Sequence, residues 1–367
     1  MKAIVRHRYG ASDVLELINL PKPTPTKDEV LIRVRAAGLN PYDWHMMRGS
    51  PWPLRLFAGL RKPKRVGLGA DVARTVVGLG QGVTEFRLGD EVFGAADGAL
   101  AEYVCGPVSG LVGKPANVSS EESAGMPIAG LTALQALRDK GQLKPGDRVL
   151  INGAAGGVGT FAVQIAKWQG THVTGVCSSR NVELVRSIGA DRAIDYTRED
   201  FAAGGELYDV IFDLVGNRDL ADFRRALKAD GVFVGCGGGG PEKPAGELLL
   251  GMLRQMVAGW FTKQKLVGVI AKRSKADLCI LRELLANGLI KPVIDRTYRL
   301  AEVPEAIRYL EEGHAQGKVI FSFDQHRHAV RRIRGAEEAS PAGSDWARCA
   351  LLDWTQAAAC GCCGLRS

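Results

Sequence analysis

The stretch from Lys144 to Gly159 combines a turn, a short apolar run and four closely spaced glycines. Lys144–Asp147 (Lys-Pro-Gly-Asp) is typical of a turn, and the aliphatic and β-branched run Arg148–Ile151 predicts a buried strand. Apolar residues recur at helical spacing from Val158 onward, after glycines at Gly153, Gly156, Gly157 and Gly159. A strand, a glycine turn and a helix in this order indicate a fold of parallel strands connected by helices.

The same turn has the features of a dinucleotide-binding site. Glycines allow backbone N–H groups to approach a pyrophosphate, and the N-terminus of the next helix provides a favourable dipole for its charge. The spacing is Gly-x-x-Gly-x-x-Gly and not the more specific Gly-x-Gly-x-x-Gly, so a glycine turn without a ligand stays open as the alternative.

The next predicted strand, Thr171–Cys177, is followed by Ser178, Ser179 and Arg180. Sites for NAD usually place an acidic residue about 20 residues after the glycines, where it binds the ribose 2′-hydroxyl. Two hydroxyls and a guanidinium suit a 2′-phosphate instead, because they donate charge-assisted hydrogen bonds. We therefore predict NADPH as the cofactor, with a helix N-cap beside a solvated arginine as the alternative.

The chain changes character near residue 120. Before it, short strands such as Phe86–Phe93 and Gly98–Val104 are separated by glycine and proline, which predicts a β-barrel-like domain. From the helix-capping sequence Ser119–Glu122 onward, strands alternate with helices such as Glu183–Ile188 and Asp219–Leu227, which predicts a doubly wound parallel sheet. The predicted strands of this sheet are Val149–Ile151, Val173–Cys177, Arg192–Ile194, Val210–Leu214, Val232–Gly235 and Leu266–Ile270.

Four later elements complete the prediction. Leu278–Leu285 and Pro304–Leu310 have helical patterns, Pro292–Tyr298 resembles a strand that returns to the first domain, and Gly317–Phe323 is a closing strand. The glycine run Gly235–Gly240 follows a predicted strand at the end where a ligand crevice is expected, although a flexible connection is equally compatible with it.

Length and composition narrow the class of protein. The 367 residues are enough for two domains, and 46% apolar and 24% charged residues describe an ordinary globular chain. No apolar run approaches the ~18 residues of a membrane span and no signal peptide is evident, so we expect a cytoplasmic enzyme with a small-molecule substrate. The net charge of +8 is scattered, which argues against nucleic acid as a partner.

Cysteines give no disulfide framework. Four of the eight occur singly in or beside predicted strands, which predicts buried thiols; they are Cys105, Cys177, Cys236 and Cys279. The other four lie in residues 324–367, where periodicity fades, and we expect this tail to be disordered. A metal-binding cysteine cluster is the alternative for the tail, although no second ligand pair has zinc spacing.

Taken together, these residues resemble the medium-chain dehydrogenase/reductase superfamily, and most closely its zinc-free quinone oxidoreductase-like and NAD(P)-dependent alcohol dehydrogenase-like branch. The motifs that carry the resemblance are Gly38–Asp43, Gly89–Phe93, Pro127–Leu134, Ala154–Gly159 and Gly313–Val319. The resemblance implies an α/β chain with a GroES-like β-barrel domain (1–122), a Rossmann doubly wound parallel-sheet domain (123–273) and a return segment (274–323) before the tail. We also expect a homodimer.

The resemblance implies no metal site. Zinc-dependent members hold catalytic zinc with a cysteine and a histidine at two places that are Asn40 and Ala70 here, and the structural zinc lobe is missing because residues 78–118 contain only Cys105. One departure stands out: where relatives usually have Asp-x-Ala-Gly, this chain has Asp71-Val-Ala-Arg74. The arginine either obstructs the cleft or points to solvent, and the sequence leaves both open.

The cofactor-binding residues follow from the motifs and from the resemblance. They are Thr132, Gly153, Ala155, Gly156, Gly157, Val158, Gly159, Ser178, Ser179, Arg180, Tyr196, Val215, Gly216 and Lys318. Thr132 matches the family's residue near the nicotinamide, and Tyr196 matches one near the 2′-phosphate.

Without a metal, the expected reaction is hydride transfer from NADPH to a quinone or an α,β-unsaturated carbonyl, because such a substrate delocalises the arriving charge onto oxygen. We assign the catalytic positions to Asn40, as a donor to the carbonyl oxygen, and to Tyr42; packing is an equal alternative for Tyr42. Zinc-independent alcohol or aldehyde interconversion and a non-catalytic NADPH-binding protein are the alternatives. The substrate pocket is expected at Ser50–Arg65 and Leu248–Thr262, which carry no readable specificity.

Overall fold

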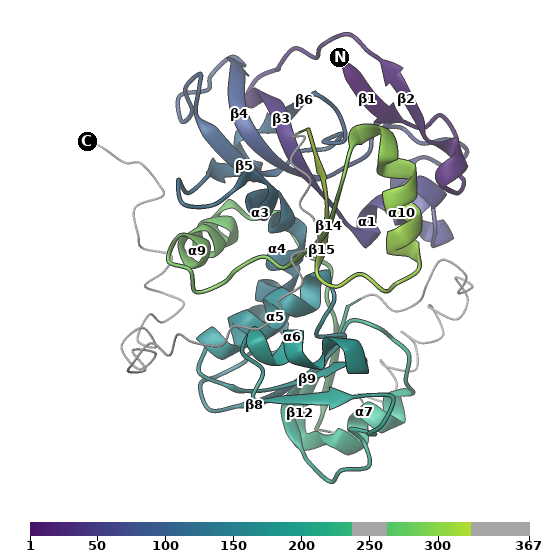
Figure 1. The fold of residues 1–367 in the computed structure, drawn as a ribbon, viewed down its shortest axis with the longest axis vertical. Coiled ribbons are helices and arrows are strands. Elements are labelled where there is room, and N and C mark those ends of the chain that lie inside the picture. The colour runs from purple at the N-terminus through teal and green to yellow at the C-terminus, as the bar shows by residue number, and fades with distance from the viewer. Residues whose placement is uncertain (237–262, 324–367) are drawn as a thin grey trace.

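The computed structural model describes residues 1–236 and 263–323, which form two large sheets and a small two-stranded one, with helices packed on and between the large sheets (Figure 1). Three predictions fall outside the described residues: the glycine run from residue 237, the pocket segment Leu248–Thr262 and the tail 324–367.

The lower sheet in Figure 1 is entirely parallel and has the strand order β10-β9-β8-β11-β12-β13. Its strands are β8 (Arg148–Asn152), β9 (His172–Cys177), β10 (Arg192–Asp195), β11 (Tyr208–Asp213), β12 (Leu227–Gly235) and β13 (Lys265–Gly268). These strands are short and mostly aliphatic, and their central residues are buried. Such runs are typical of strands that are covered on both faces.

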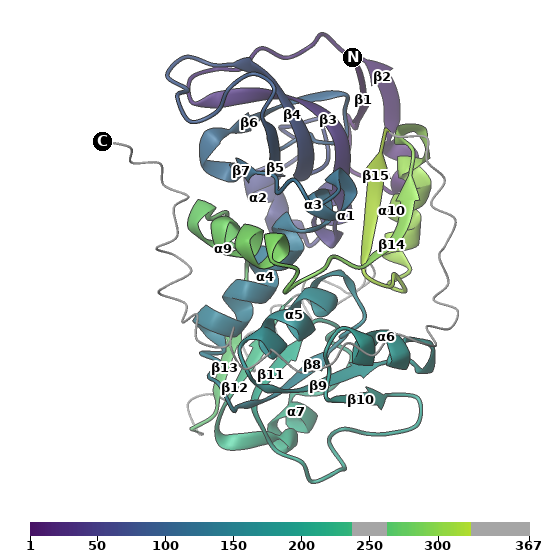
Figure 2. The ribbon, with the colours of Figure 1, turned by 60° about the vertical axis from the view of Figure 1, so that its left-hand side comes forward.

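Helices cover both faces of this sheet (Figure 2). On one face, α5 (Gly157–Trp168) and α4 (Pro127–Gln135) share a core with Val149 and Phe212, and α6 (Val182–Ser187) lies beside them. On the other face, α7 (Leu220–Ala226) shares a second core with Leu150 and Ile211. The predicted doubly wound Rossmann-like sheet is therefore confirmed.

The upper sheet is built around one long strand, β3 (Glu29–Leu39), which pairs with three others. Its order is β14-β15-β3-β4-β5-β7, and β6 also pairs with β3. The other members are β4 (Asp71–Leu79), β5 (Glu91–Ala95), β6 (Tyr103–Pro107), β7 (Leu111–Gly113), β14 (Ile294–Tyr298) and β15 (Lys318–Ser322). A separate hairpin joins β1 (Lys2–Val5) to β2 (Glu16–Asn19).

The last described segment crosses back from the lower sheet to the upper one. Helix α9 (Lys275–Ala286) packs against α4 and β7, and β15 then runs antiparallel to β3 while α10 (Val303–Glu311) packs against α1 (Pro41–Arg48). Strands β14 and β15 therefore belong to the same sheet as β3. The exact domain limits stay predictions.

Several local predictions differ from the structure. The predicted strands Phe86–Phe93 and Gly98–Val104 begin late, because turns occupy their first halves and β5 and β6 start at Glu91 and Tyr103. The predicted loop Ser50–Arg65 contains a short helix, α2 (Arg55–Ala58). At Ser119 the predicted capping box is confirmed, and α3 (Ser120–Gly125) follows it.

The cysteine prediction was only partly right. Cys177 is buried, but Cys105, Cys236 and Cys279 are half-buried, and Cys279 lies in α9 rather than in or beside a strand. Its helical position follows from the amphipathic pattern of α9, in which Leu278 and Leu281 face the core. All four of these cysteines are free thiols.

Among the described residues, no helix is long and apolar enough to cross a membrane.

Candidate active site

The site is organised around Asn40, at the point where β3 ends and α1 begins. Asn40 has extended backbone angles, Pro41 occupies the first helical turn, and the carboxylate of Asp43 accepts a hydrogen bond from the Asn40 amide at 2.8 Å. Proline is pre-shaped for the start of a helix, and a reciprocal acid at this place satisfies an otherwise unpaired amide. The second carboxylate oxygen of Asp43 accepts from the amide of Gly69 at 3.2 Å.

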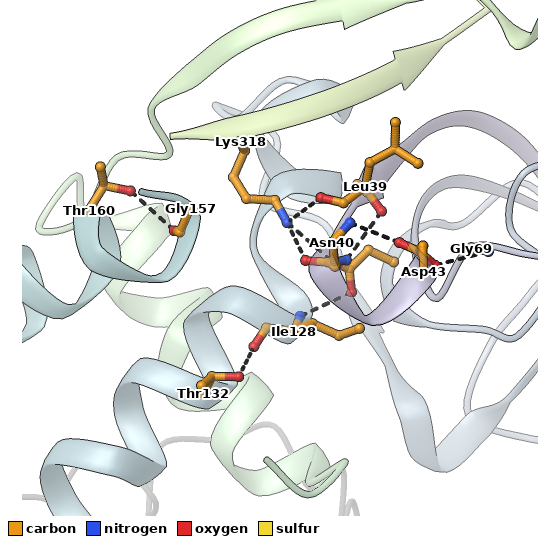
Figure 3. A network of polar contacts seen from close by, with 11 residues as sticks. Leu39, Asn40, Asp43, Gly69, Ile128, Thr132, Gly157, Thr160 and Lys318 are labelled. Atoms are coloured by element: carbon orange, nitrogen blue, oxygen red, sulfur yellow. Dashed lines mark hydrogen bonds and ion pairs between the residues drawn. The ribbon is translucent and has the colours of Figure 1, made fainter. Parts of the chain in front are cut away.

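A buried polar network extends from Asn40 to residues far away in the sequence (Figure 3). The Asn40 Nδ2 atom donates to Asp71 Oδ2 at 2.9 Å and to the Gly38 carbonyl at 3.3 Å. The Lys318 Nζ atom donates to Asn40 Oδ1 at 2.5 Å and to the Leu39 carbonyl at 3.2 Å. Segments from β3, β4 and β15 are thereby fixed to one another.

The network also reaches the lower domain. Asp71 Oδ1 accepts a hydrogen bond from the amide of Ile128, in the first turn of α4, at 3.0 Å. One helical turn further along, Thr132 donates its hydroxyl to the Ile128 carbonyl at 2.7 Å. Asp71 thus bonds a strand of the upper sheet directly to the helix that carries Thr132.

Burial sets the charge states in this network. Asn40, Asp43, Asp71 and Lys318 are each exposed by 2% or less. Burial raises the pKa of Asp43 to about 7, although hydrogen bonds from the Asn40 and Gly69 amides act against it. Burial also raises the pKa of Asp71 and lowers that of Lys318, and their opposite charges, 3.7 Å apart, partly offset both shifts.

This geometry changes the interpretation of Asn40. Both hydrogens of its amide nitrogen are donated within the protein, so it can polarise a substrate carbonyl only by giving up the longer bond, to Gly38. The geometry favours Asn40 as a brace of the site more than as a free donor.

The side chain of Tyr42, by contrast, is partly exposed to solvent. It is 40% exposed, and its pKa is raised by partial burial and by the negative charge of Asp97. Asp97 accepts hydrogen bonds from both Arg65 and Arg273, and the positive charge of Arg273 acts on Tyr42 in the opposite direction. Tyr42 therefore keeps its hydroxyl proton at neutral pH and is able to donate it in a hydrogen bond.

The predicted glycine turn lies at the N-terminus of α5. Gly153 has φ of +88°, and a Cβ on Gly159 would lie 2.1 Å from the Gly153 carbonyl oxygen, so the turn closes tightly only with glycine at these places. Gly156 precedes α5 and Gly157 is its first residue. A helix start offers backbone amides and a favourable dipole to an anion such as a pyrophosphate, and the small residues of this turn leave room for its approach, which fits a dinucleotide.

Neighbouring residues complete this edge of the lower sheet. Val215 and Gly216 follow β11, and both of their amides donate to Asp213 Oδ1 at 3.1 Å. Ala155, before the helix, accepts a hydrogen bond from the amide of Gly317 at 2.8 Å, and Val158 lies in the first turn of α5. Gly317 immediately precedes Lys318, so two consecutive residues of the chain contact the glycine turn and the Asn40 network.

The residues predicted to bind a 2′-phosphate lie together after β9. Ser178 accepts a hydrogen bond from the Asn181 side chain, and Ser179 donates to Asp195 at 2.5 Å. Arg180 is exposed and donates to the His314 carbonyl at 2.9 Å. Tyr196, 49% exposed, follows β10.

The sequence analysis assigned no role in the site to three residues that the structure places there. Asp71 was considered only as part of a motif, and the Asp97–Arg273 pair near Tyr42 joins residues that are 176 positions apart. No short-range pattern marks such a pair. An isolated acid in an otherwise apolar stretch, as at Asp71, is the one signal that was available.

Within residues 1–236 and 263–323, no group of three or more histidine, cysteine, aspartate or glutamate side chains is arranged to hold a metal ion. At the two places where zinc-dependent relatives carry ligands, Asn40 is bonded into the network and Ala70 has no donor atom in its side chain.

Comparison with known proteins identifies both parts of the chain. Residues 26–116 match the alcohol dehydrogenase GroES-like domain, and residues 188–321 match the model described as zinc-binding dehydrogenase. A chloroplastic quinone oxidoreductase of Triphysaria versicolor is 35% identical, over 87% of this chain and 98% of the relative. A chloroplastic NADPH-dependent alkenal/one oxidoreductase of Arabidopsis thaliana is 34% identical, over 87% of this chain and 79% of its own length.

Solved structures give the same result. The quinone oxidoreductase from Coxiella burnetii superimposes with a TM-score of 0.77 at 34% identity, covering 88% of this chain and 99% of that one. The match extends over both sheets and the return segment. Sequence, fold and site geometry agree that this chain belongs to the medium-chain dehydrogenase/reductase superfamily.

Proposed function

We propose that this protein is an NADPH-dependent oxidoreductase that reduces a quinone or an α,β-unsaturated carbonyl by hydride transfer, without a catalytic metal. The observation that carries the proposal is the buried Asn40–Asp71–Lys318 network, whose groups interact with each other and which includes Asn40, at a place where the family resemblance would put a zinc ligand. The similar proteins named as quinone and alkenal/one oxidoreductases support the substrate class.

The cofactor is assigned to the edge of the lower sheet. The glycine turn, with Gly153, Gly156, Gly157 and Gly159, would hold the pyrophosphate, and Ala155 and Val158 belong to the same cradle. Ser178, Ser179, Arg180 and Tyr196 would surround the 2′-phosphate, and Thr132, Val215, Gly216 and Lys318 would lie toward the nicotinamide. When bound, NADPH supplies the hydride.

The protein's own part is to position and polarise. Tyr42, which keeps its proton, would donate a hydrogen bond to the substrate carbonyl oxygen, where negative charge develops during the reaction. Asn40 and Lys318 would hold the β3–α1 junction in place below it. Water supplies the final proton to the enolate or hydroquinone oxygen, so no buried acid is required.

A screen with NADPH deuterated at C4 tests the reaction. We expect deuterium on the β-carbon of enone products and fast NADPH oxidation with quinones, against slow turnover of saturated ketones and alcohols. The purified protein should keep this activity in a chelator. Turnover confined to alcohols and saturated ketones, or activity that depends on added zinc, would contradict the proposal.

A cytoplasmic location and a homodimer stay predictions. Sedimentation of the purified protein checks the second.

A further inference from the structure

A cavity of about 290 Å³ lies on the upper domain and is lined by three arginines. Arg33 and Arg35 come from β3 and Arg74 from β4, and the remaining walls include Tyr103 of β6 and Phe323 after β15. Arg74 lies three residues beyond Asp71 on the same strand, whereas the glycine turn belongs to the lower sheet. The cavity is thus separate from the cofactor-binding edge.

A strand irregularity brings the third arginine to the other two. Arg33 and Arg35 are two residues apart, so they project from the same face of β3, and Arg33 lies opposite Tyr103 on β6. Arg74 lies opposite Val34, and regular pairing would place it on the other face of the sheet. The register shift between Val34 and Ala36 and the positive φ of Arg74 interrupt that regular pattern, and Arg74 lines the same cavity as Arg33 and Arg35.

Two arginines of this cluster have no direct partner. In the described part of the chain, neither Arg33 nor Arg74 has an ion-pair or side-chain hydrogen-bond partner. Burial and the positive charges of Arg35 and Arg33 lower the pKa of Arg74, and the negative charges of Glu91 and Glu121 only partly offset this shift. The carboxylate of Glu102, which also lines the cavity, already accepts a hydrogen bond from the backbone amide of Lys2 at 2.7 Å.

A fourth cation lies close by. The Lys22 ammonium is 4.3 Å from the centre of the ring of Tyr103, a residue that lines the cavity. Like charges held together in a half-buried space repel each other, and an anion bound among them removes that cost.

Arg74 also occupies an unfavourable backbone position. Its φ of +157° lies in the range that favours glycine, the residue that the family resemblance predicts at this place. Backbone outliers of this kind cluster at functional sites, where the surrounding structure maintains them. A large cationic side chain at such a position points to a function that a glycine does not perform.

We propose that this cavity binds a small oxyanion, a phosphomonoester or a carboxylate, that carries an aromatic or apolar group. Guanidinium groups suit phosphate and carboxylate oxygens because they donate paired, charge-assisted hydrogen bonds. Tyr103 and Phe323 form apolar walls for the rest of the ligand. This inference does not rest on the oxidoreductase function.

Calorimetric titration of the full-length protein with phenyl phosphate, inorganic phosphate and benzoate tests the proposal. Saturating NADPH is present, and the Arg180→Ala variant is titrated in parallel, so that binding at the predicted 2′-phosphate position is recognised. We expect saturable binding of phenyl phosphate that weakens with added salt. Arg74→Ala and Arg33→Ala should each raise its Kd roughly tenfold or more.

Arg87→Ala is the matched control, because Arg87 is an exposed arginine in a turn outside the cavity and its loss changes the net charge equally. Tighter binding of benzoate than of phenyl phosphate identifies the natural ligand as a carboxylate and supports the proposal. Absence of saturable binding of all three probes overturns it. So does binding that Arg74→Ala and Arg33→Ala leave unchanged, or that Arg180→Ala abolishes.

Discussion

Lys318 and Asn40 are 278 residues apart in the chain, yet the lysine ammonium lies 2.5 Å from the asparagine side-chain oxygen. Both side chains are buried, and Asp71 lies 3.7 Å from the same ammonium. The last strand of the described fold therefore supplies the only cation of the Asn40 network among the described residues.

Replacing Lys318 should destabilise the protein strongly. Lys318→Met leaves Asp71 buried without its cation, and loss of one partner of a buried pair costs about 3–5 kcal/mol in free energy of unfolding. Urea unfolding measures this effect. The double variant Lys318→Met/Asp71→Asn should recover part of the loss, because it leaves no lone charge.

Lys275→Met is the matched control, since Lys275 forms an ion pair with Glu85 at the surface and such pairs contribute about 0–1 kcal/mol. Equal losses in free energy of unfolding for Lys318→Met and Lys275→Met would show that the buried pair contributes no more to stability than the surface pair.

Asp43 should make the protein less stable as pH rises. Its pKa is about 7 in the folded state and near 3.8 when exposed, so the folded state binds more protons between these values. Its contribution to stability is complete below pH 4 and is lost as pH rises to about 7, by at most about 4 kcal/mol. Asp43→Asn should remove this slope in urea unfolding measured from pH 4 to 8.

Asp191 provides a control of opposite sign. Hydrogen bonds from Lys167 and the Val173 amide outweigh partial burial and lower its pKa, so its contribution to stability is lost as pH falls. An unchanged slope in Asp43→Asn would mean that Asp43 is ionised in the folded protein throughout this range.

Removing the Tyr42 hydroxyl should slow turnover without weakening cofactor binding. Loss of one donor to a developing oxyanion typically lowers kcat by ~10²-fold. We expect this for Tyr42→Phe with an enone substrate, while the Kd of NADPH stays constant. Tyr103→Phe, on β6 and outside the Asn40 network, should leave kcat unchanged. A Tyr42→Phe enzyme with normal kcat would assign Tyr42 to packing.

Cofactor preference should depend on both Arg180 and Asp195. Arg180→Ala should reduce the preference for NADPH over NADH by roughly 1–3 kcal/mol, the usual cost of a lost charge-assisted hydrogen bond. Asp195→Asn should increase the preference, because it removes a negative charge that holds the Ser179 hydroxyl. Arg186→Ala, on the exposed face of α6, should change neither affinity.

Arg74 gives a prediction about strain. Arg74→Gly should raise the melting temperature, because it relieves both the strain of the backbone angle and the repulsion from Arg35. The backbone strain alone is worth about 1–3 kcal/mol. Arg74→Ala keeps a Cβ and relieves only the repulsion, so it should stabilise less. Equal melting temperatures for the two variants would mean that the backbone angle carries no cost.

The sequence predicted structure correctly where it depends on neighbouring residues, and less well where it depends on residues far apart in the chain. The order strand, glycine turn, helix at Arg148–Gly159 is a local pattern, and β8 and α5 appear where it placed them. The predicted role of Asn40 as a donor to the substrate agrees less well with the structure, because its side chain already bonds to Asp71 and Lys318, which come from other strands. No local pattern indicates which distant groups will occupy a side chain's hydrogens.

The same reasoning applies to the arginine cavity. Arg74 was recognised as unusual from its motif, but neither of the two outcomes considered, an obstructed cleft or a solvent-exposed side chain, describes its position. It is half-buried in a cavity that Arg33 and Arg35 also line, at a place where the pairing of β3 with β4 shifts register, and sequence spacing does not reveal such a shift.

The return of the chain to its first sheet has a consequence for synthesis on the ribosome. Residues Ala36–Leu39 of β3 pair on one side with Ser322–Val319 of β15, and these partners are made almost 300 residues later. Until they emerge, that part of β3 has backbone groups without a strand partner, at the very place where Asn40 begins α1. An unpaired strand edge invites association with other chains. A nascent chain that stops short of β15 is therefore the form of this protein that most needs a chaperone.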